Sequence, residues 1–303
     1  MTLPPTIVVV GDVMIDILVQ PSGPIREGTD TPARIRRAPG GSGANQAAWL
    51  ARAGNRVIFL GRVGAREHDE ECRLLREGGV EPHLGADADM PTGMVVNLIA
   101  PDGQRSFLTD RGANDALGAV DLDPTHLVGV QLLHVSGYAF SAPAPRAAVC
   151  AFLEAAAVCG VPVSVDPASS ALLQAVGPAA FRAWTRSATL CIVNADEAAL
   201  LAESDDLAEQ LRVLAAHYGT VVVKRGPLGA AAARGEERWS YPAPRVQVLD
   251  TTGAGDAFLA AFVSARLRGS AMEQCLEAGI RAGSAATTHL GGRPPREADA
   301  AEI

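Results

Sequence analysis

The stretch Ile7-Val8-Val9-Val10-Gly11-Asp12 decides the fold class of this 303-residue chain. Four consecutive apolar residues end at a glycine and an acid, with no alternation between polar and apolar positions. A short continuous run of this kind is typical of a central parallel strand that is buried on both faces. We therefore expect a parallel sheet whose first strand ends at Asp12.

Four later runs are similar, since each is mainly apolar and leads into a polar residue. They are residues 161–165 before Asp166, 190–193 before Asn194, 221–223 before Lys224, and 246–249 before Asp250. Helical patterns lie between or after the runs at residues 145–159 and 204–218, and in a segment that a capping box at Ser270 and Glu273 would open. Strands that alternate with helices predict an α/β fold with a doubly wound, mainly parallel sheet flanked by helices. Ligands of such sheets bind at the carboxyl ends of the strands, where these polar residues stand.

Two pairs of short extended segments interrupt this alternation. Residues 17–19 and 33–37 surround a turn rich in Pro and Gly, and residues 94–100 and 105–109 flank the hairpin signal Pro101-Asp102-Gly103-Gln104. We interpret the four segments as a small β-sheet lid over one end of the parallel sheet. The predicted division places residues 1–12, 40–88 and 113–303 in an α/β core that binds nucleotide and substrate, and residues 13–39 and 89–112 in the lid.

The composition limits the possible partners. The formal net charge is −8 and no block of Lys or Arg is present, so the chain lacks the basic surface that binds nucleic acid or an anionic membrane. The N-terminal apolar run is too short for a signal peptide or a membrane span, and a cytoplasmic protein is expected. Five widely spaced cysteines without a C-x-x-C pair argue against a disulfide framework or a protein-held zinc site.

A glycine-rich segment, Asp250-Thr251-Thr252-Gly253-Ala254-Gly255-Asp256, precedes an apolar predicted helix. The N–H groups of a helix N-terminus form an anion site together with the helix dipole, and glycines let the backbone approach a ligand closely. As a helix N-cap, Asp256 would be unremarkable. The alternative is catalysis, because phosphoryl transfer needs hydrogen-bond donors for the phosphoryl group and a carboxylate that accepts the hydroxyl proton.

A second glycine-rich segment, residues 39–48, also opens a predicted helix, which ends near Gly54. Its glycine spacing does not match the dinucleotide-binding fingerprint, and the preceding segment is not a buried strand. Asn45 could bond sugar hydroxyls from the first turns of this helix, or the segment could be an ordinary helix start. Asp12 and Asp16 are likewise either solvated loop acids or a pair that binds vicinal hydroxyls.

Five segments in chain order resemble the signatures of the ribokinase-like (PfkB) carbohydrate kinases. Residues 250–258 resemble the C-terminal signature of that family and residues 40–54 its N-terminal signature. Residues 11–16 resemble its substrate-binding start, residues 194–197 its N-x-x-E element, and residues 224–229 its K-x-G-x-x-G nucleotide segment. The resemblance spans nearly the whole chain. It implies a carbohydrate kinase that moves the γ-phosphoryl group of ATP to a hydroxyl, expected to be a primary CH2OH, of a sugar or sugar-like small molecule.

The same resemblance implies a role for each matching residue. Asp256 would be the general base, beside an anion hole made by the backbone of Gly253, Ala254 and Gly255. The substrate would be held by Asp12, Asp16, Gly41 and Asn45. Asn194 and Glu197 would hold Mg²⁺ and phosphate, largely through water, and the nucleotide site would be lined by Lys224, Gly226 and Gly229. A potassium ion would be bound by Asp250 and Thr252 with backbone near Gly291. The lid would close over the sugar, exclude water, and pair with a second copy to form a homodimer.

Several choices stay open at the level of the sequence. Ser42 stands where ribokinases proper have lysine, and residues 133–137 supply no acid for the sugar, so ribose is not singled out among pentoses, hexoses, sugar acids and nucleosides. Arg111 could contact a carboxylate or phosphate of the substrate, or pair with Asp110 or Asp115 at the surface. A non-catalytic sensor on the same fold is disfavoured by the intact Asp256 and its glycines. A dinucleotide-dependent oxidoreductase is disfavoured because no G-x-G-x-x-G follows the first strand.

Overall fold

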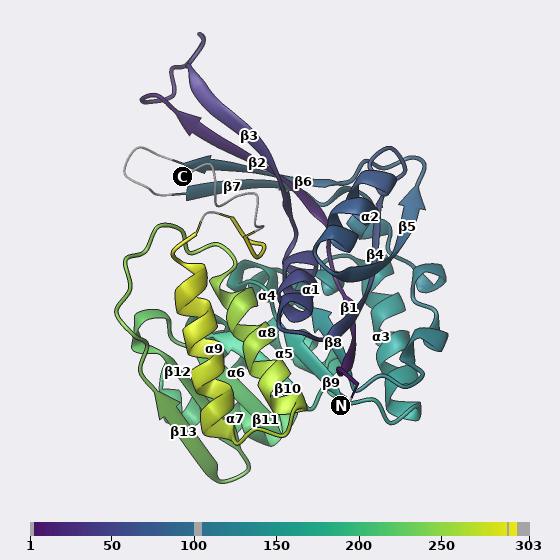
Figure 1. Cartoon of the computed structure of the whole chain (residues 1–303), viewed down its shortest axis with the longest axis vertical. Coiled ribbons are helices and arrows are strands. Elements are labelled where there is room, and N and C mark those ends of the chain that lie inside the picture. The colour runs from purple at the N-terminus through teal and green to yellow at the C-terminus, as the bar shows by residue number, and fades with distance from the viewer. Residues whose placement is uncertain (1–2, 100–104, 290, 296–303) are drawn as a thin grey trace.

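The computed structural model describes residues 3–99, 105–289 and 291–295, and a nine-stranded sheet forms its centre (Figure 1). The strand order is β13-β12-β11-β10-β9-β8-β1-β4-β5, and every pairing is parallel except β11–β12 and β12–β13. The strands are β1 (Thr6–Val10), β4 (Arg56–Gly64), β5 (Val80–Asp87), β8 (Leu132–Ser136), β9 (Val163–Asp166), β10 (Leu190–Asn194), β11 (Thr220–Lys224), β12 (Ala230–Arg234) and β13 (Glu237–Tyr241). The predicted mainly parallel sheet is confirmed.

Strand β1 lies between β8 and β4, and its side chains show why both faces of the sheet are covered. Ile7 and Val9 are buried in one apolar core, and Val8 and Val10 in the other. The core of Ile7 is completed by α1 (Ser42–Arg52), α2 (His68–Glu77), α8 (Ala254–Leu267) and α9 (Met272–Ala286). The core of Val8 is completed by α3 (Pro143–Val158), α4 (Ser170–Val176), α5 (Pro178–Trp184), α6 (Ala195–Ala202) and α7 (Leu207–Tyr218). Short 3₁₀ helices connect several elements: η1 (Gly112–Ala116), η2 (Ala119–Asp121), η3 (Pro124–Leu127), η4 (Gly137–Phe140) and η5 (Gly226–Leu228).

A separate four-stranded sheet stands above one end of this core in Figure 1. Its order is β3-β2-β6-β7, with strands β2 (Met14–Pro21), β3 (Ala33–Gly40), β6 (Gly93–Ile99) and β7 (Arg105–Asp110). The pairs β2–β3 and β6–β7 are antiparallel, as expected for two hairpins, and β2 joins β6 in parallel. The predicted turn at residues 101–104 lies outside the described residues. We call this second sheet the lid.

Two local predictions are wrong. Residues 246–249 form no strand: Val248 is 57% exposed, and the chain instead bonds the end of α9 through Leu249 N–H to Thr287 O (2.8 Å). The apolar run resembled a buried strand, but these side chains line a cavity. Helix α9 has its N-cap at Ala271, one residue after the predicted Ser270, because Gln274 Oε1 accepts the N–H of Ala271.

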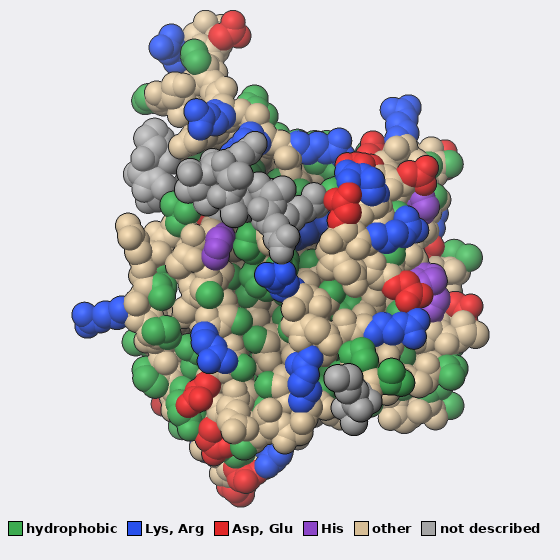
Figure 2. Space-filling model, in the orientation of Figure 1, with side chains coloured by type: hydrophobic (Ala, Val, Ile, Leu, Met, Phe, Trp, Pro, Cys, Tyr) green, Lys and Arg blue, Asp and Glu red, His purple; other side chains and the backbone are tan. Residues whose placement is uncertain are grey.

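The described residues contain no helix long and apolar enough to cross a membrane. On the face drawn in Figure 2, basic and acidic side chains are interspersed over the core and do not gather into one basic surface.

Candidate active site

Two adjoining cavities lie at the carboxyl ends of the parallel strands. The larger, of about 840 Å³, is bounded on one side by lid residues such as Val95 and Phe107, and we call it the sugar-side cavity. The smaller, of about 560 Å³, extends along α8 and α9, and we call it the nucleotide-side cavity. Lys224, Gly226 and Gly255 line both, which marks where the two cavities meet.

Most of the predicted site residues face these cavities. The sugar-side cavity is lined by Asp12, Asp16, Gly41, Asn45, Arg111, Asn194, Glu197, Thr252, Gly253 and Asp256, in addition to the three shared residues. Ala254 and Gly229 line the nucleotide-side cavity. Asp250 is buried beside the cavities without lining either. The structure therefore brings together residues that are up to 244 positions apart, from Asp12 to Asp256.

Asp256 lies in the first turn of α8, and the expectation that it could serve as N-cap is wrong. The N-cap is Gly253, whose φ of 75° is left-handed backbone that glycine adopts without strain. A Cβ at Gly253 would lie 2.3 Å from the carbonyl oxygen of Gly292, so no larger residue fits. Of the three predicted backbone donors, Ala254 N–H already donates to Thr251 O at 3.3 Å.

The electrostatic environment of Asp256 holds its proton more tightly than usual. Burial and the negative charge of Asp166 raise the pKa of Asp256 to about 7, against the opposing effect of Lys224. A carboxylate with a pKa near neutrality is suited to accept a proton and to release it again.

Lys224 and Asp166 form an ion pair beside Asp256, with Lys224 Nζ 2.8 Å from Asp166 Oδ2. They stand at the carboxyl ends of β11 and β9. Burial lowers the pKa of Lys224, but the charges of Asp166 and Glu197 outweigh burial and raise it overall. Lys224 is therefore a fixed positive charge where the two cavities meet. A Cβ added to Gly255 would lie 3.3 Å from Lys224 Nζ.

On the sugar side, Asp12 is buried at the end of β1 and accepts the N–H of Gly43 at 3.0 Å. Asp16 follows on β2, where burial and the charge of Asp12 raise its pKa to about 6. Arg111 pairs with Asp12 and with Asp115, each at 3.5 Å. The predicted pairing of Arg111 with Asp115 is thus present, but Asp110 instead accepts the N–H of Gly112.

The N-x-x-E element has a structural role that the sequence did not reveal. Asn194 caps α6 and accepts the N–H of Glu197, while Glu197 accepts both the N–H and the side-chain Nδ2–H of Asn194. Burial and Asp166 raise the pKa of Glu197 to about 7. The carboxylate is therefore held in one orientation at the cavity wall.

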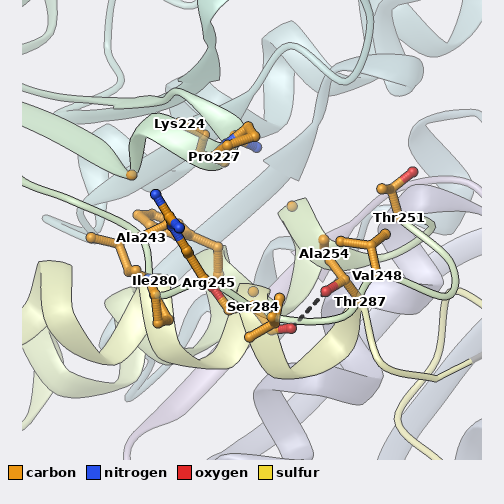
Figure 3. A pocket seen from close by; sticks show the side chains of 17 residues that line it. Lys224, Pro227, Ala243, Arg245, Val248, Thr251, Ala254, Ile280, Ser284 and Thr287 are labelled. Atoms are coloured by element: carbon orange, nitrogen blue, oxygen red, sulfur yellow. Dashed lines mark hydrogen bonds between the residues drawn. The ribbon is translucent and has the colours of Figure 1, made fainter.

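The nucleotide-side cavity has an apolar wall that sequence reasoning missed. Figure 3 shows Val248, Ala243 and Ile280 around a space that Lys224 and Pro227 enter from the opposite side. The signal was present in the sequence as the apolar run at residues 246–249, which was interpreted as a strand.

Asp250 and Thr252, the predicted potassium ligands, belong to the loop before α8. Asp250 accepts the N–H of Thr252 at 2.7 Å and the N–H of Gly291 at 3.0 Å. The three positions that the resemblance grouped together are therefore adjacent in space.

Comparisons with known proteins show the family and agree with the fold. The family described as pfkB family carbohydrate kinase matches residues 5–299. A fructokinase of Klebsiella pneumoniae is 32% identical over 266 residues, covering 84% of this chain and 82% of its own. A probable sugar kinase of Rhizobium etli superposes with a TM-score of 0.87 at 26% identity, covering 99% of this chain and 98% of its own. A ribokinase of Cryptococcus neoformans in complex with ADP superposes with a TM-score of 0.78 at 25% identity, covering 99% of this chain and all of its own.

Proposed function

Because the chain belongs to the pfkB family of carbohydrate kinases, we propose that it transfers the γ-phosphoryl group of ATP to a primary hydroxyl of a sugar-like molecule, with Asp256 as general base. The observation that carries this proposal is the position of Asp256. It lines the sugar-side cavity at the N-terminus of a helix, next to Gly255, which lines both cavities, and its pKa is close to neutrality.

In this reaction Asp256 accepts the proton of the acceptor hydroxyl while the hydroxyl oxygen attacks the γ-phosphorus of ATP. The new O–P bond forms as the bond to the bridging oxygen breaks, and ADP leaves with that electron pair. The backbone N–H groups of Gly253 and Gly255 and the ammonium of Lys224 stabilise the charge on the transferred group. Asp256 then releases its proton to solvent.

The acidic residues of the site fit Mg²⁺ that is held mainly through water and ATP phosphates. Within the described residues no group of three or more His, Cys, Asp and Glu could hold a metal ion alone. Mg²⁺ typically keeps several waters and takes one or two carboxylates together with substrate phosphates. Glu197, beside Asn194, offers such a carboxylate at the cavity wall, and the ion would supply neutralisation of phosphate charge. Potassium would be bound near Asp250, Thr252 and Gly291, and its replacement by lithium should lower turnover.

The sugar-side cavity favours a neutral polyhydroxylated acceptor over a sugar acid. The charge of Arg111 is already matched by Asp12 and Asp115, and Asp16 adds a further acid. The Oδ1 atoms of Asn45 and Asn97 are buried without a hydrogen-bond partner among the described residues. Hydroxyl groups of a sugar would donate to them, whereas a carboxylate would meet like charge.

The lid would close over the sugar and also mediate a homodimer. Ile35 and Leu108 are 62% and 61% exposed on the lid. Strand register places both on the face that points away from the cavity, since Phe107 and Thr109 line it. Exposed apolar surface of this kind is typical of an interface.

The test is an ADP-release assay with Mg²⁺ and K⁺ against a panel of neutral sugars, sugar acids and nucleosides. We expect one strong neutral acceptor, and a loss of turnover of about 10²–10⁴ in Asp256→Asn while ATP still binds. Near-normal turnover in that variant would refute Asp256 as the base. A sugar acid as the strong acceptor would refute the argument from Arg111.

A further inference from the structure

A chain of polar side chains, buried except at the half-buried Ser42, leads from the middle of the sheet to Asp256. Ser42 Oγ lies 3.3 Å from Asp256 Oδ1, and Gln46 Nε2 lies 3.1 Å from Ser42 Oγ. Beyond Gln46, its Oε1 lies 2.9 Å from His134 Nε2, and His134 Nδ1 lies 2.6 Å from Ser164 Oγ. Gln46, His134 and Ser164 are fully buried. The proposed function assigns none of these four side chains a role.

The chain connects three elements that share one face of the core. Ser42 and Gln46 are one turn apart in α1. His134 and Ser164 are register partners on the adjacent strands β8 and β9. His134 also pairs with Val9 of β1, so it lies on the face of the sheet that α1 covers. Polar residues in the centre of an apolar sheet are costly unless every one is hydrogen-bonded.

The hydrogen bonds of this chain run in a single direction. Burial lowers the pKa of His134 to about 4, so the ring is neutral and carries one N–H. Gln46 Nε2 donates to Ser42, which leaves Gln46 Oε1 as an acceptor, and His134 must therefore carry its hydrogen on Nε2. His134 Nδ1 then accepts from the hydroxyl of Ser164. Since Ser42 Oγ already accepts from Gln46, its own hydrogen is free to point at Asp256.

We propose that Ser42, Gln46, His134 and Ser164 are positioning residues that fix a hydrogen-bond donor on Oδ1 of Asp256 and leave Oδ2 for the substrate hydroxyl. The inference rests on the proposed role of Asp256 as the base. Ser42 donates directly to the carboxylate, and the Gln46 amide also interacts with it. His134 and Ser164 act through Gln46, because their hydrogen bonds prevent its amide from rotating. An amide locked at both ends cannot exchange its oxygen and nitrogen without leaving a buried group unpaired.

The pKa of Asp256 depends on the charges and hydrogen-bond donors around it. Asp12 and Asp166 face it from β1 and β9 and favour its protonated form, while Lys224 from β11 favours the ionised form. The hydrogen-bond donors of α1 act in the same direction as Lys224, since the Gln46 amide also lowers the pKa of Asp256. Removal of a donor should therefore raise that pKa and make the base protonated over a wider range of pH.

The experiment is the pH dependence of kcat/KM for wild type, Ser42→Ala and His134→Leu, measured with the best acceptor and the same MgATP concentration. ATP protonation then affects all variants equally. Loss of a hydrogen bond to the carboxylate disfavours its ionised form, so we expect the acidic limb of the pH profile of Ser42→Ala to move upward by about one pH unit. His134→Leu should move it in the same direction, and rates should approach wild type at high pH. Ser42→Thr keeps the hydroxyl and should restore the limb.

Asn55→Ala is the matched control, because Asn55 Nδ2 makes buried bonds to Leu50 O and Ser264 Oγ between the far end of α1 and α8. It should lower thermal stability without moving the acidic limb. A uniform loss of rate at all pH values in Ser42→Ala, with the limb unmoved, would overturn the proposal even if His134→Leu fails to fold.

A second measurement does not depend on activity. The ¹⁵N shifts of His134 should report a neutral ring protonated on Nε2 from pH 6 to 9. A hydrogen on Nδ1 would reverse the deduced direction and refute the chain. Asp256→Asn distinguishes the two proposals. Retained turnover in that variant would refute Asp256 as the base. If that variant loses turnover but the acidic limb of Ser42→Ala does not move, only the positioning role is refuted.

Discussion

At the scale of single residues, the properties of the site depend on how burial and neighbouring charges shift the pKa of each acid. Asp256 is ordinary in kind, yet burial and Asp166 move its pKa to about 7. Because a general base works in its ionised form, kcat/KM should fall about tenfold per pH unit as the pH drops through this value. An acidic limb nearer pH 4 would mean that another group limits the rate.

Asp166 provides the sharpest test of this environment. Asp166→Asn removes the negative charge that raises the pKa of Asp256 and leaves Lys224 without its 2.8 Å partner. Both effects favour the ionised base, so the acidic limb should move to lower pH by about one unit. Asp196→Asn, at an exposed acid in the first turn of α6, should leave the limb in place. A limb that stays put or rises in Asp166→Asn would contradict the assigned cause of the shift.

The sequence predicted residues that belong to recognisable segments, and missed those whose importance comes only from proximity. Asp12, Asn45 and Asp256 were found because each stands in a short signature. Asp166 was predicted only as a polar residue after a strand, because its ion-pair partner, Lys224, is 58 positions away in the sequence. Ion pairs of this kind follow from strand order, which a single sequence does not reveal.

At the scale of elements, the turn before α8 fixes the backbone that carries Asp256. Gly253 has a left-handed φ and lies against the backbone of Gly292, whereas a Cβ at Gly255 would meet only the flexible end of Lys224. Gly253→Ala should therefore lower thermal stability by several degrees and abolish turnover, because backbone cannot move aside cheaply. Gly255→Ala should stay folded and lose less activity, while Gly255→Val should lose it by blocking the phosphate. Equal effects of the two alanine variants, in a melting scan and an ADP assay, would contradict this distinction.

Periodicity predicted the central strands well and the segment before this turn badly. Residues 7–10 and 221–223 are buried on both faces, as their continuous apolar character indicated. Residues 246–249 are also mainly apolar, but for a different reason, since Val246 and Val248 line the nucleotide-side cavity. An apolar run indicates that its side chains contact something other than water. The sequence alone does not tell whether that is the protein core or a ligand site.

At the scale of the whole molecule, the lid offers a surface for a second copy. The double variant Ile35→Lys/Leu108→Lys places two charges on its outer apolar face and should convert a dimer into a monomer in sedimentation velocity. Val128→Lys, at a site that is 80% exposed on the core, should leave the dimer intact. A monomeric wild type would refute the dimer, and a dimeric double variant would place its interface elsewhere.

The order of strands in the sheet also constrains how the chain can fold. β1 precedes β4 and β8, with which it pairs, and its Ile7 and Val9 face is closed by helices that include α8 and α9, which follow it by more than 240 positions. Contacts so distant in sequence form slowly, because loop closure must precede the contacts that reward it. A ribosome that has not yet released α8 and α9 therefore holds an incomplete core with apolar surface exposed, which is the state that chaperones bind. The helix that carries Asp256 is thus also one of the elements that complete this core, and phosphoryl transfer cannot begin before α8 and α9 have been made and packed.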